Sequence, residues 1–146
     1  MKNYNLSLSK NKSNNADILK HLERCNNLFH PILSSYINLE EYALKLFEKA
    51  MRYEFFKDEK LIGIIALYHY KNIGYITNFS LEKEFLGKGL ADQLMELCFY
   101  DVKLQKVNKI RLEVFKENKR AIKFYFKHSF IIDQENDKTL ILKKNI

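Results

Sequence analysis

Glycine, proline and cysteine are scarce in this sequence of 146 residues, which contains four glycines, one proline and two cysteines. With 47% hydrophobic and 14% aromatic residues, this composition excludes a disordered or low-complexity chain and indicates a folded domain. Cys25 and Cys98 lack the spacing of a metal-binding or redox motif. We therefore expect two buried free thiols, which suit a reducing compartment.

Long apolar runs and blocks of like charge are also missing. No apolar stretch reaches the ~18 residues that a membrane span needs, and the first ten residues do not resemble a signal peptide. We expect a cytoplasmic protein with no membrane partner. The net charge of +7 comes from Lys and Arg scattered among Asp and Glu, which favours a solvated surface over nucleic-acid binding.

Apolar periodicity predicts a single α+β domain over residues 1–146. Helical patterns cover about residues 14–29, 38–50, 89–102 and 117–130. β-patterns cover about residues 3–9, three runs within 52–81, and then 109–115, 130–134 and 139–144. This order is typical of a mixed, mostly antiparallel sheet of about six to seven strands flanked by four helices.

Two of the four glycines stand almost side by side in "EFLGKGLADQLM", residues 84–95. Gly87 and Gly89 lie where a strand that ends near Leu81 gives way to a helix. The first turn of a helix leaves N–H groups without partners, which attract a phosphate, and glycine has no Cβ to block its approach. The pair predicts a pyrophosphate-binding loop, although turn formation alone explains the same glycines. The NAD-binding and Walker patterns do not fit here.

A second motif follows in "LEVFKENKRAIKFYFKHSF", residues 112–130. With "LGKGLA" upstream, it resembles the GNAT superfamily of acetyl-CoA-dependent N-acetyltransferases. That family carries Arg/Gln-x-x-Gly-x-Gly/Ala after its fourth strand and later a stretch like Asn-x-x-Ala-Ile-x-Leu-Tyr-x-x-x-Gly-Phe. The second stretch is matched here by Asn118, Ala121, Ile122, Phe124, Tyr125 and Phe130.

The chain departs from the family pattern at two positions. Leu86 stands where the family usually has Arg or Gln, so one side chain near the pyrophosphate is missing while the backbone cradle is kept. Ser129 replaces the usual glycine, a change that bears on the turn before Phe130.

The resemblance implies acetyl-CoA as the cosubstrate, with no metal. In the family, the strand before the glycine loop splays from its neighbour, and its free amides bind the thioester end. By itself that strand shows Ile76, Asn78 and Ser80 alternating with Tyr75, Thr77 and Phe79. The cosubstrate site implied here consists of Phe79, Ser80, Leu81, Leu86, Gly87, Lys88, Gly89, Leu90, Ala91, Asp92, Asn118 and Tyr125.

Two residues are candidates for acid–base chemistry. Tyr125 matches the family tyrosine that protonates the departing sulfur, and a phenol with a pKa near 10 keeps its proton at neutral pH. Glu113 alternates with apolar neighbours in "IRLEV", in a Leu-Glu-Val…Asn…Tyr arrangement similar to ribosomal-protein N-terminal alanine acetyltransferases, where such a glutamate is the base. The alternatives are a tyrosine that only packs in the core and an exposed, ion-paired glutamate. Two further carboxylates near the glycine loop, Glu82 and Glu84, are expected to be solvated.

The acceptor amine is the least determined part. His30, Ser34 and Tyr36 lie in the break between the first two helices and are the candidate acceptor-binding residues. A basic protein disfavours polycationic acceptors. We expect an N-acetyltransferase for a small-molecule amine, with an amino sugar as one example; a peptide N-terminal acetyltransferase and a catalytically silent CoA-binding module are the alternatives. The sequence does not separate a monomer from a homodimer.

Overall fold

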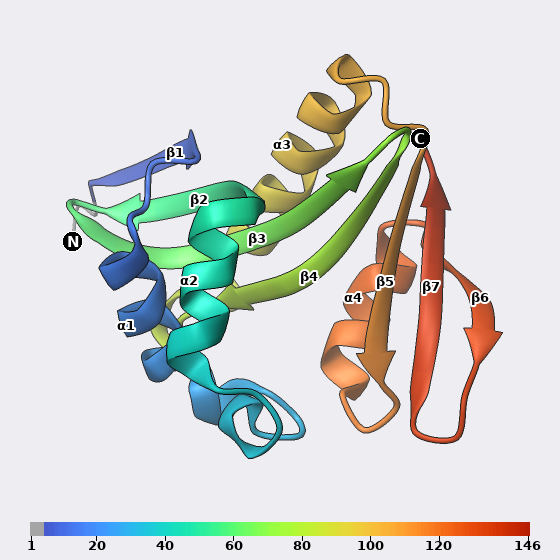
Figure 1. The fold of residues 1–146 in the computed structure, drawn as a ribbon, viewed down its shortest axis with the longest axis horizontal. Helices are drawn as coiled ribbons and strands as arrows, with labels where there is room; N and C mark the ends of the chain where they lie inside the picture. Colours follow the sequence, from blue (N-terminus) through green and yellow to red (C-terminus); the bar gives the residue numbers. More distant parts are fainter. Residues whose placement is uncertain (1–4) are drawn as a thin grey trace.

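The computed structural model describes residues 5–146 and contains one seven-stranded sheet (Figure 1). The strand order is β1-β2-β3-β4-β5-β7-β6, and only β4 and β5 run parallel. The strands are β1 (Leu6–Lys10), β2 (Met51–Lys57), β3 (Lys60–Tyr70), β4 (Ile73–Leu81), β5 (Lys109–Phe115), β6 (Ile131–Glu135) and β7 (Thr139–Asn145). Tyr4, which the sequence pattern places in the first strand, lies outside the described residues.

Four α-helices cover the two faces of this sheet, which confirms the predicted α+β fold. They are α1 (Asn15–Cys25), α2 (Leu39–Lys49), α3 (Leu90–Leu104) and α4 (Lys119–Lys127). In Figure 1, α1 and α2 lie on one face, whereas α3 and α4 lie on the other. Each face has its own buried core, one built around Ile18, Leu22 and Leu46 and one around Leu94, Met95 and Cys98.

Side-chain caps fix where several helices begin. Asn14 forms a capping box with Asp17 at the start of α1, and the Asn38 side chain accepts a hydrogen bond from the Glu41 amide at the start of α2.

The first helix was expected to run to about Phe29, but its α-helical part ends at Cys25. A 3₁₀ turn over Asn26–Leu28 follows.

The centre of the sheet opens along its length. β4 and β5 meet at one end and diverge toward the other (Figure 1). Their parallel ladder joins only Ile73–Ile76 to Lys109–Leu112. Within residues 5–146, the rest of β4 therefore has strand partners only on its β3 side. Its second edge, from Thr77 to Leu81, is left for another partner.

A β-bulge at Thr77 changes which way the side chains of β4 point. Asn78 pairs with Ala66 and Ile76 with Leu67, so Thr77 is an extra residue between them. Strict alternation, which would place Ile76 on the same face as Asn78, is therefore wrong here. Ile76 packs into the core on the α3 side, as Leu67 does, while Asn78 faces the α1–α2 side, as Ala66 does.

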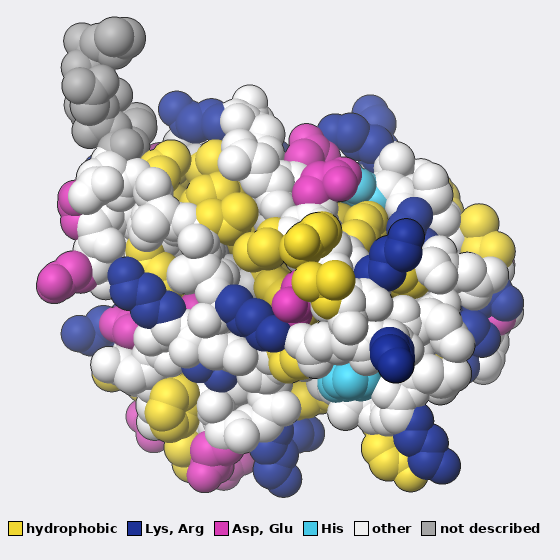
Figure 2. Space-filling model, turned by 90° about the horizontal axis from the view of Figure 1, so that it is seen from above, with side chains coloured by type: hydrophobic (Ala, Val, Ile, Leu, Met, Phe, Trp, Pro, Cys, Tyr) yellow, Lys and Arg dark blue, Asp and Glu magenta, His cyan; other side chains and the backbone are white. Residues whose placement is uncertain are grey.

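No helix of residues 5–146 is long and apolar enough to cross a membrane. Cys25 and Cys98 are buried free thiols, as predicted. Lys and Arg are spread over the face seen in Figure 2, with Asp and Glu side chains among them.

Candidate active site

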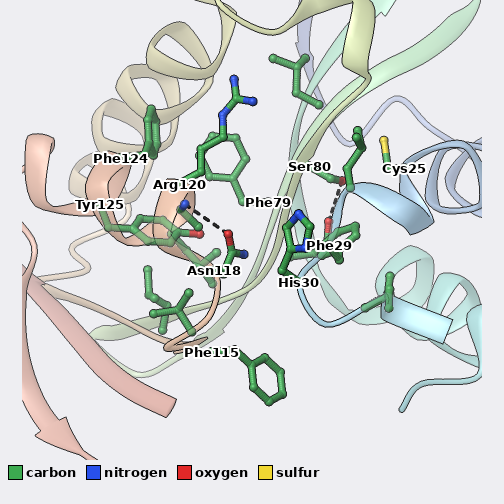
Figure 3. Close-up of a pocket in the computed structure, with 18 of the residues that line it drawn as sticks. Cys25, Phe29, His30, Phe79, Ser80, Phe115, Asn118, Arg120, Phe124 and Tyr125 are labelled. Carbon is green, nitrogen blue, oxygen red and sulfur yellow. Dashed lines mark hydrogen bonds between the residues drawn. The ribbon is translucent and has the colours of Figure 1, made fainter. Parts of the chain in front are cut away.

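A cavity of about 800 Å³ lies where β4 and β5 diverge (Figure 3). Its walls come from the end of α1 and the segment before α2, from β4 and β5, from the loop before α3 and from α4. Parts of the chain that are far apart in sequence thus face one common space. Most of the residues predicted for the site line this cavity: His30, Tyr36, Phe79, Ser80, Leu81, Leu86, Gly87, Gly89, Ala91, Asp92, Glu113, Asn118 and Tyr125.

The glycine loop has the geometry of an anion cradle. Gly87 and Gly89 have φ angles of +75° and +80°, in the left-handed region that favours glycine. A Cβ atom built on either glycine would meet no protein atom within 4 Å. The loop therefore presents bare backbone to open space, directly before the N-terminus of α3. These residues fit the pyrophosphate of a coenzyme A molecule.

Other residues of the loop have different environments. Leu86 and Ala91 line the cavity, whereas Lys88 and Leu90 are not among its lining residues. Leu90 instead packs into the core as a buried side chain. Any contribution of Lys88 and Leu90 to the binding of an anion would thus come through their backbone.

Asp92, in the first turn of α3, ties this helix to α4. Its carboxylate lies 2.7 Å from His128 Nε2 and 3.0 Å from Lys127 Nζ. These hydrogen bonds, from Lys127 first and His128 second, hold the pKa of Asp92 below its usual range. Asp92 lines the cavity, but its carboxylate is directed to Lys127 and His128 at the end of α4.

Tyr125 lies on α4 and lines the cavity. The residue is 7% exposed, and its ring packs against Phe79 and Phe130 at centroid distances of 6.3 and 5.5 Å. Figure 3 shows its hydroxyl pointing into the cavity beside Asn118. Burial, with a smaller contribution from Tyr42, raises the pKa of Tyr125 above its ordinary value, so the phenol keeps its proton at neutral pH.

Asn118 caps α4 and also lines the cavity. Its Oδ1 accepts a hydrogen bond of 3.3 Å from the Ala121 amide (Figure 3), so capping the helix is compatible with a place in the cosubstrate site. Three cationic side chains of α4 are candidates to bind the phosphates of the cosubstrate: Lys119, Arg120 and Lys123. Arg120 lines the cavity, while Lys119 and Lys123 are exposed outside it.

Glu113 lies on the β5 wall of the cavity and is exposed. Ile110, Leu112 and Val114 are buried, so the predicted alternation along this strand is correct. Glu113 accepts a hydrogen bond of 2.7 Å from the Thr139 hydroxyl, a partner on β7 that sequence spacing does not reveal.

The segment before α2 supplies an aromatic wall on the acceptor side. Tyr36 lines the cavity and stacks edge to face on Phe115, with ring centroids 5.3 Å apart. His30 is exposed at the rim. Ser34 does not line the cavity, because its side chain and amide are bound to Asn26.

Some lining residues were not predicted for the site, among them Tyr42 and Phe115. The Tyr42 hydroxyl of α2 donates a hydrogen bond of 2.8 Å to the carbonyl of Thr77, and this holds the bulge of β4. Phe29 and Phe115 add aromatic surface (Figure 3). Tyr42 shares the helical spacing of the apolar residues Leu39, Ala43 and Leu46, a pattern that predicts a core residue instead of a cavity residue.

Glu82 was expected to be solvated, and this prediction is wrong. The residue is 6% exposed, and its Oε1 lies 2.9 Å from Arg24 Nε and 3.2 Å from Lys60 Nζ. Its contacts come from α1 and β3, which a local sequence pattern does not connect. Glu84, in contrast, is exposed as expected.

The turn after α4 keeps its shape although serine replaces glycine. Ser129 adopts φ +70°, the conformation that a glycine takes most easily. The Ser129 amide donates to Phe126 and the Phe130 amide to Tyr125, which is the Schellman arrangement at a helix end. The departure from the family pattern therefore costs backbone strain but leaves the helix end intact.

No group of three or more His, Cys, Asp or Glu side chains in residues 5–146 is arranged to hold a metal ion.

Comparison with known proteins identifies the family. The sequence model of the acetyltransferase (GNAT) family matches residues 16–130. The acetyltransferase PseH of Campylobacter jejuni subsp. jejuni serotype O:23/36 (strain 81-176) is 32% identical over 111 residues, which cover 71% of this chain and 69% of PseH.

Solved structures share the fold. The PaiA N-acetyltransferase from Thermoplasma acidophilum, in complex with coenzyme A, matches with a TM-score of 0.78 and 18% identity, over 96% of this chain and 99% of that one. The ribosomal-protein-S18-alanine N-acetyltransferase from Escherichia coli matches with a TM-score of 0.73 and 14% identity, over 97% and 94%. This chain therefore belongs to the GNAT family and is an acetyl-CoA-dependent N-acetyltransferase.

Proposed function

We propose that this enzyme acetylates the primary amine of a small molecule, such as an amino sugar, by direct attack while both substrates are bound. The observation that carries the proposal is the single cavity that joins the glycine cradle, Tyr125 and an aromatic pocket. An acceptor placed among Phe29, Tyr36 and Phe115 would lie across the opening between β4 and β5 from the glycine loop. Both substrates can then meet at the splayed edge of β4.

In this proposal, main-chain groups and α4 bind the cosubstrate. Bound acetyl-CoA would supply a thioester whose carbonyl carbon is attacked by the amine. The amides of Gly87 and Gly89 would hold its pyrophosphate, and Arg120 would add a positive charge. The free edge of β4 at Phe79 to Leu81 supplies hydrogen-bond donors for an oxygen that becomes negative during transfer.

Tyr125 is proposed as the general acid. Its hydroxyl keeps its proton in the buried site and can donate it to the sulfur that leaves. Glu113, the base candidate of the sequence analysis, places a carboxylate on the β5 wall, where it can attract the ammonium group of the acceptor.

Direct attack fits the cavity better than an acetyl-cysteine route. Cys25 lines the cavity, but burial, reinforced by Glu82, raises the pKa of its thiol to about 12. A thiol that stays protonated is a poor nucleophile.

The acceptor class is inferred from the lining of the pocket. Phe29, Tyr36 and Phe115 offer flat apolar surface, while Asn78 and Ser80 offer a few hydrogen bonds. Such a lining suits a compact ring with hydroxyl groups better than a polycation. A sugar that carries one amine has this chemistry.

The test is release of free thiol from acetyl-CoA with a panel of amino sugars, polyamines, aminoglycosides and short peptides. We expect turnover with amino sugars and none with polyamines. Turnover with peptides alone would instead make this a peptide N-terminal acetyltransferase. Binding of CoA without turnover on any amine would mark a catalytically silent module.

A further inference from the structure

A chain of buried polar side chains runs from the cavity into the α1 side of the sheet. Ser80 lines the cavity, and its Oγ lies 2.9 Å from His21 Nε2 and 2.9 Å from Asn78 Oδ1. Figure 3 shows Ser80 on β4 beside the end of α1. A hydroxyl has one hydrogen, so Ser80 donates to the imidazole or to the amide oxygen at any one time.

Behind Ser80 lies a histidine that solvent does not reach. His21 has 0% exposure, and its Nδ1 lies 3.9 Å from Glu82 Oε2. That carboxylate oxygen is buried and has no hydrogen-bond partner among residues 5–146. A buried oxygen without a partner is costly. It therefore favours a proton on His21 Nδ1, which leaves Nε2 free to accept one from Ser80.

The far end of the chain reaches water. Glu82 Oε1 contacts Arg24 Nε and Lys60 Nζ, whose side chains are 32% and 45% exposed. Burial raises the pKa of Glu82, but His21, Arg24 and Lys60 outweigh that effect and hold it below its usual range. The carboxylate is thus ionised at neutral pH and can stabilise an imidazolium next to it.

The other group against this imidazole does not compete for the proton. Cys25 Sγ lies 3.7 Å from His21 Nε2 and 3.9 Å from Nδ1. With its pKa raised to about 12, mainly by burial, this thiol stays protonated at neutral pH.

From this geometry we propose that Ser80, His21 and Glu82 form a proton relay that deprotonates the acceptor amine. The inference rests on the proposed function. The ammonium gives a proton to Ser80 Oγ while the Ser80 hydroxyl proton passes to His21 Nε2. One N–H bond of the acceptor breaks, one N–H bond of the imidazole forms, and the electron pair stays on the acceptor nitrogen for attack. Ser80 is the catalytic residue of the relay, and His21 and Glu82 are positioning residues that act through it.

The relay differs from a base role of Glu113, which lies on β5 instead of β4. It also differs from a nucleophilic role of Ser80, in which the acetyl group would be carried by the serine oxygen. The three possibilities give different results with the same set of variants.

The experiment measures kcat and the KM for acetyl-CoA, with the amine that the panel identifies, in Ser80→Ala, His21→Gln and the double variant. Substitutions within one relay have non-additive effects on kcat. We therefore expect each single change to lower kcat ~10²-fold and the kcat of the double variant to fall no further. The KM for acetyl-CoA and the heat of CoA binding should stay unchanged. Ser35→Ala is the matched control, because its hydroxyl bonds the Ile32 carbonyl and does not line the cavity.

Two further measurements separate chemistry from structure. Added imidazole should restore turnover to His21→Ala but not to Ser80→Ala. In the absence of substrates, the ¹⁵N resonance of His21 Nε2 in Ser80→Ala should differ from that in the wild type, while those of the other three histidines stay in place. If His21→Ala does not fold, Ser80→Ala and this resonance still decide the matter.

Unchanged kcat in folded, CoA-binding Ser80→Ala and His21→Gln variants would overturn the relay. So would an acetyl group found on Ser80 by mass spectrometry, or a loss of turnover confined to Glu113→Gln. A wild-type protein that turns over with no amine would contradict the proposed function itself, and the relay with it.

Discussion

Individual residues show why burial matters more than identity at this site. Nine tyrosines occur in the chain, and Tyr125 differs from the exposed Tyr100 by its packing and by a hydroxyl that faces the cavity. Burial keeps its phenol protonated, which is the state that a general acid needs. Two of the four glycines, Gly87 and Gly89, lie where the backbone has a left-handed φ and where a Cβ atom would occupy the space proposed for the pyrophosphate. The chemistry therefore depends on a few positions that the fold holds in place.

Removing the Tyr125 hydroxyl should slow the reaction without loosening the site. Tyr125→Phe keeps the ring packing, so kcat should fall ~10²-fold while CoA binding stays nearly the same. Steady-state kinetics and calorimetry test this, with Tyr100→Phe as the control on an exposed tyrosine of α3. An unchanged kcat in Tyr125→Phe would remove this residue from the mechanism.

A side chain in the glycine cradle should weaken CoA binding. Gly89→Ala places a Cβ in the space where the pyrophosphate is proposed to lie, and its positive φ costs about 1–2 kcal/mol of stability. We expect the Kd for CoA to rise at least ~10-fold, since one charge-assisted hydrogen bond is worth about 1.5–3 kcal/mol.

Asp58→Ala controls for backbone strain, because Asp58 has φ +53° in the turn between β2 and β3, far from the glycine loop in sequence. It should alter stability but leave the CoA affinity unchanged. Equal CoA affinity in Gly89→Ala and the wild type would argue against the cradle.

Glycine at position 129 should stabilise the protein. Ser129 has φ +70°, and relief of a left-handed conformation is worth about 1 kcal/mol. Urea denaturation of Ser129→Gly should show an increased free energy of unfolding with an unchanged kcat. A loss of stability would mean that the serine makes a contribution that outweighs its strain.

At the scale of helices and strands, most of the fold follows from local patterns. Alternation and 3.6-residue periodicity indicate the strands and helices, and asparagines mark the starts of α1, α2 and α4. The bulge at Thr77 was not predictable in this way, because the Tyr42 hydroxyl of another element holds it. The same reason explains Glu82, whose partners lie on α1 and β3.

The site could be predicted in part for the same physical reason. Gly87, Gly89, Asn118 and Tyr125 belong to short motifs, each on a single loop or helix. The contacts of Ser80 with His21 join positions 59 residues apart, and only the packed sheet brings them together. Local sequence patterns carry no information on such pairs.

The tie between α3 and α4 predicts an acid-dependent contribution to stability. The pKa of Asp92 is lowered by Lys127 and His128, so its ion pairs stabilise the fold above the ordinary pKa of Asp, about 3.9, and are lost as the pH falls below it. Urea denaturation gives the free energy of unfolding of the wild type and of Asp92→Asn. The wild type should have the higher value at pH 6, and this difference should shrink toward about pH 2. A difference that stays constant over this range would contradict the tie.

At the scale of the whole molecule, the split sheet is the central feature. In the sheet, β1–β4 with α1 and α2 lie on one side of the opening, and β5 lies on the other (Figure 1). The cavity is lined by β4, by the end of α1 and the segment before α2, by β5 and α4, and by the glycine loop before α3. Each face of the sheet is packed around its own buried side chains. The opening between β4 and β5 follows from their short parallel ladder, which joins only Ile73–Ile76 to Lys109–Leu112.

The most direct test of this arrangement is a crystal structure with coenzyme A bound. We expect density for the pyrophosphate over Gly87 and Gly89, and the thiol sulfur between β4 and β5, within hydrogen-bond reach of the Tyr125 hydroxyl. Coenzyme A bound elsewhere, or a sulfur that lies outside the opening between β4 and β5, would contradict the proposed mechanism.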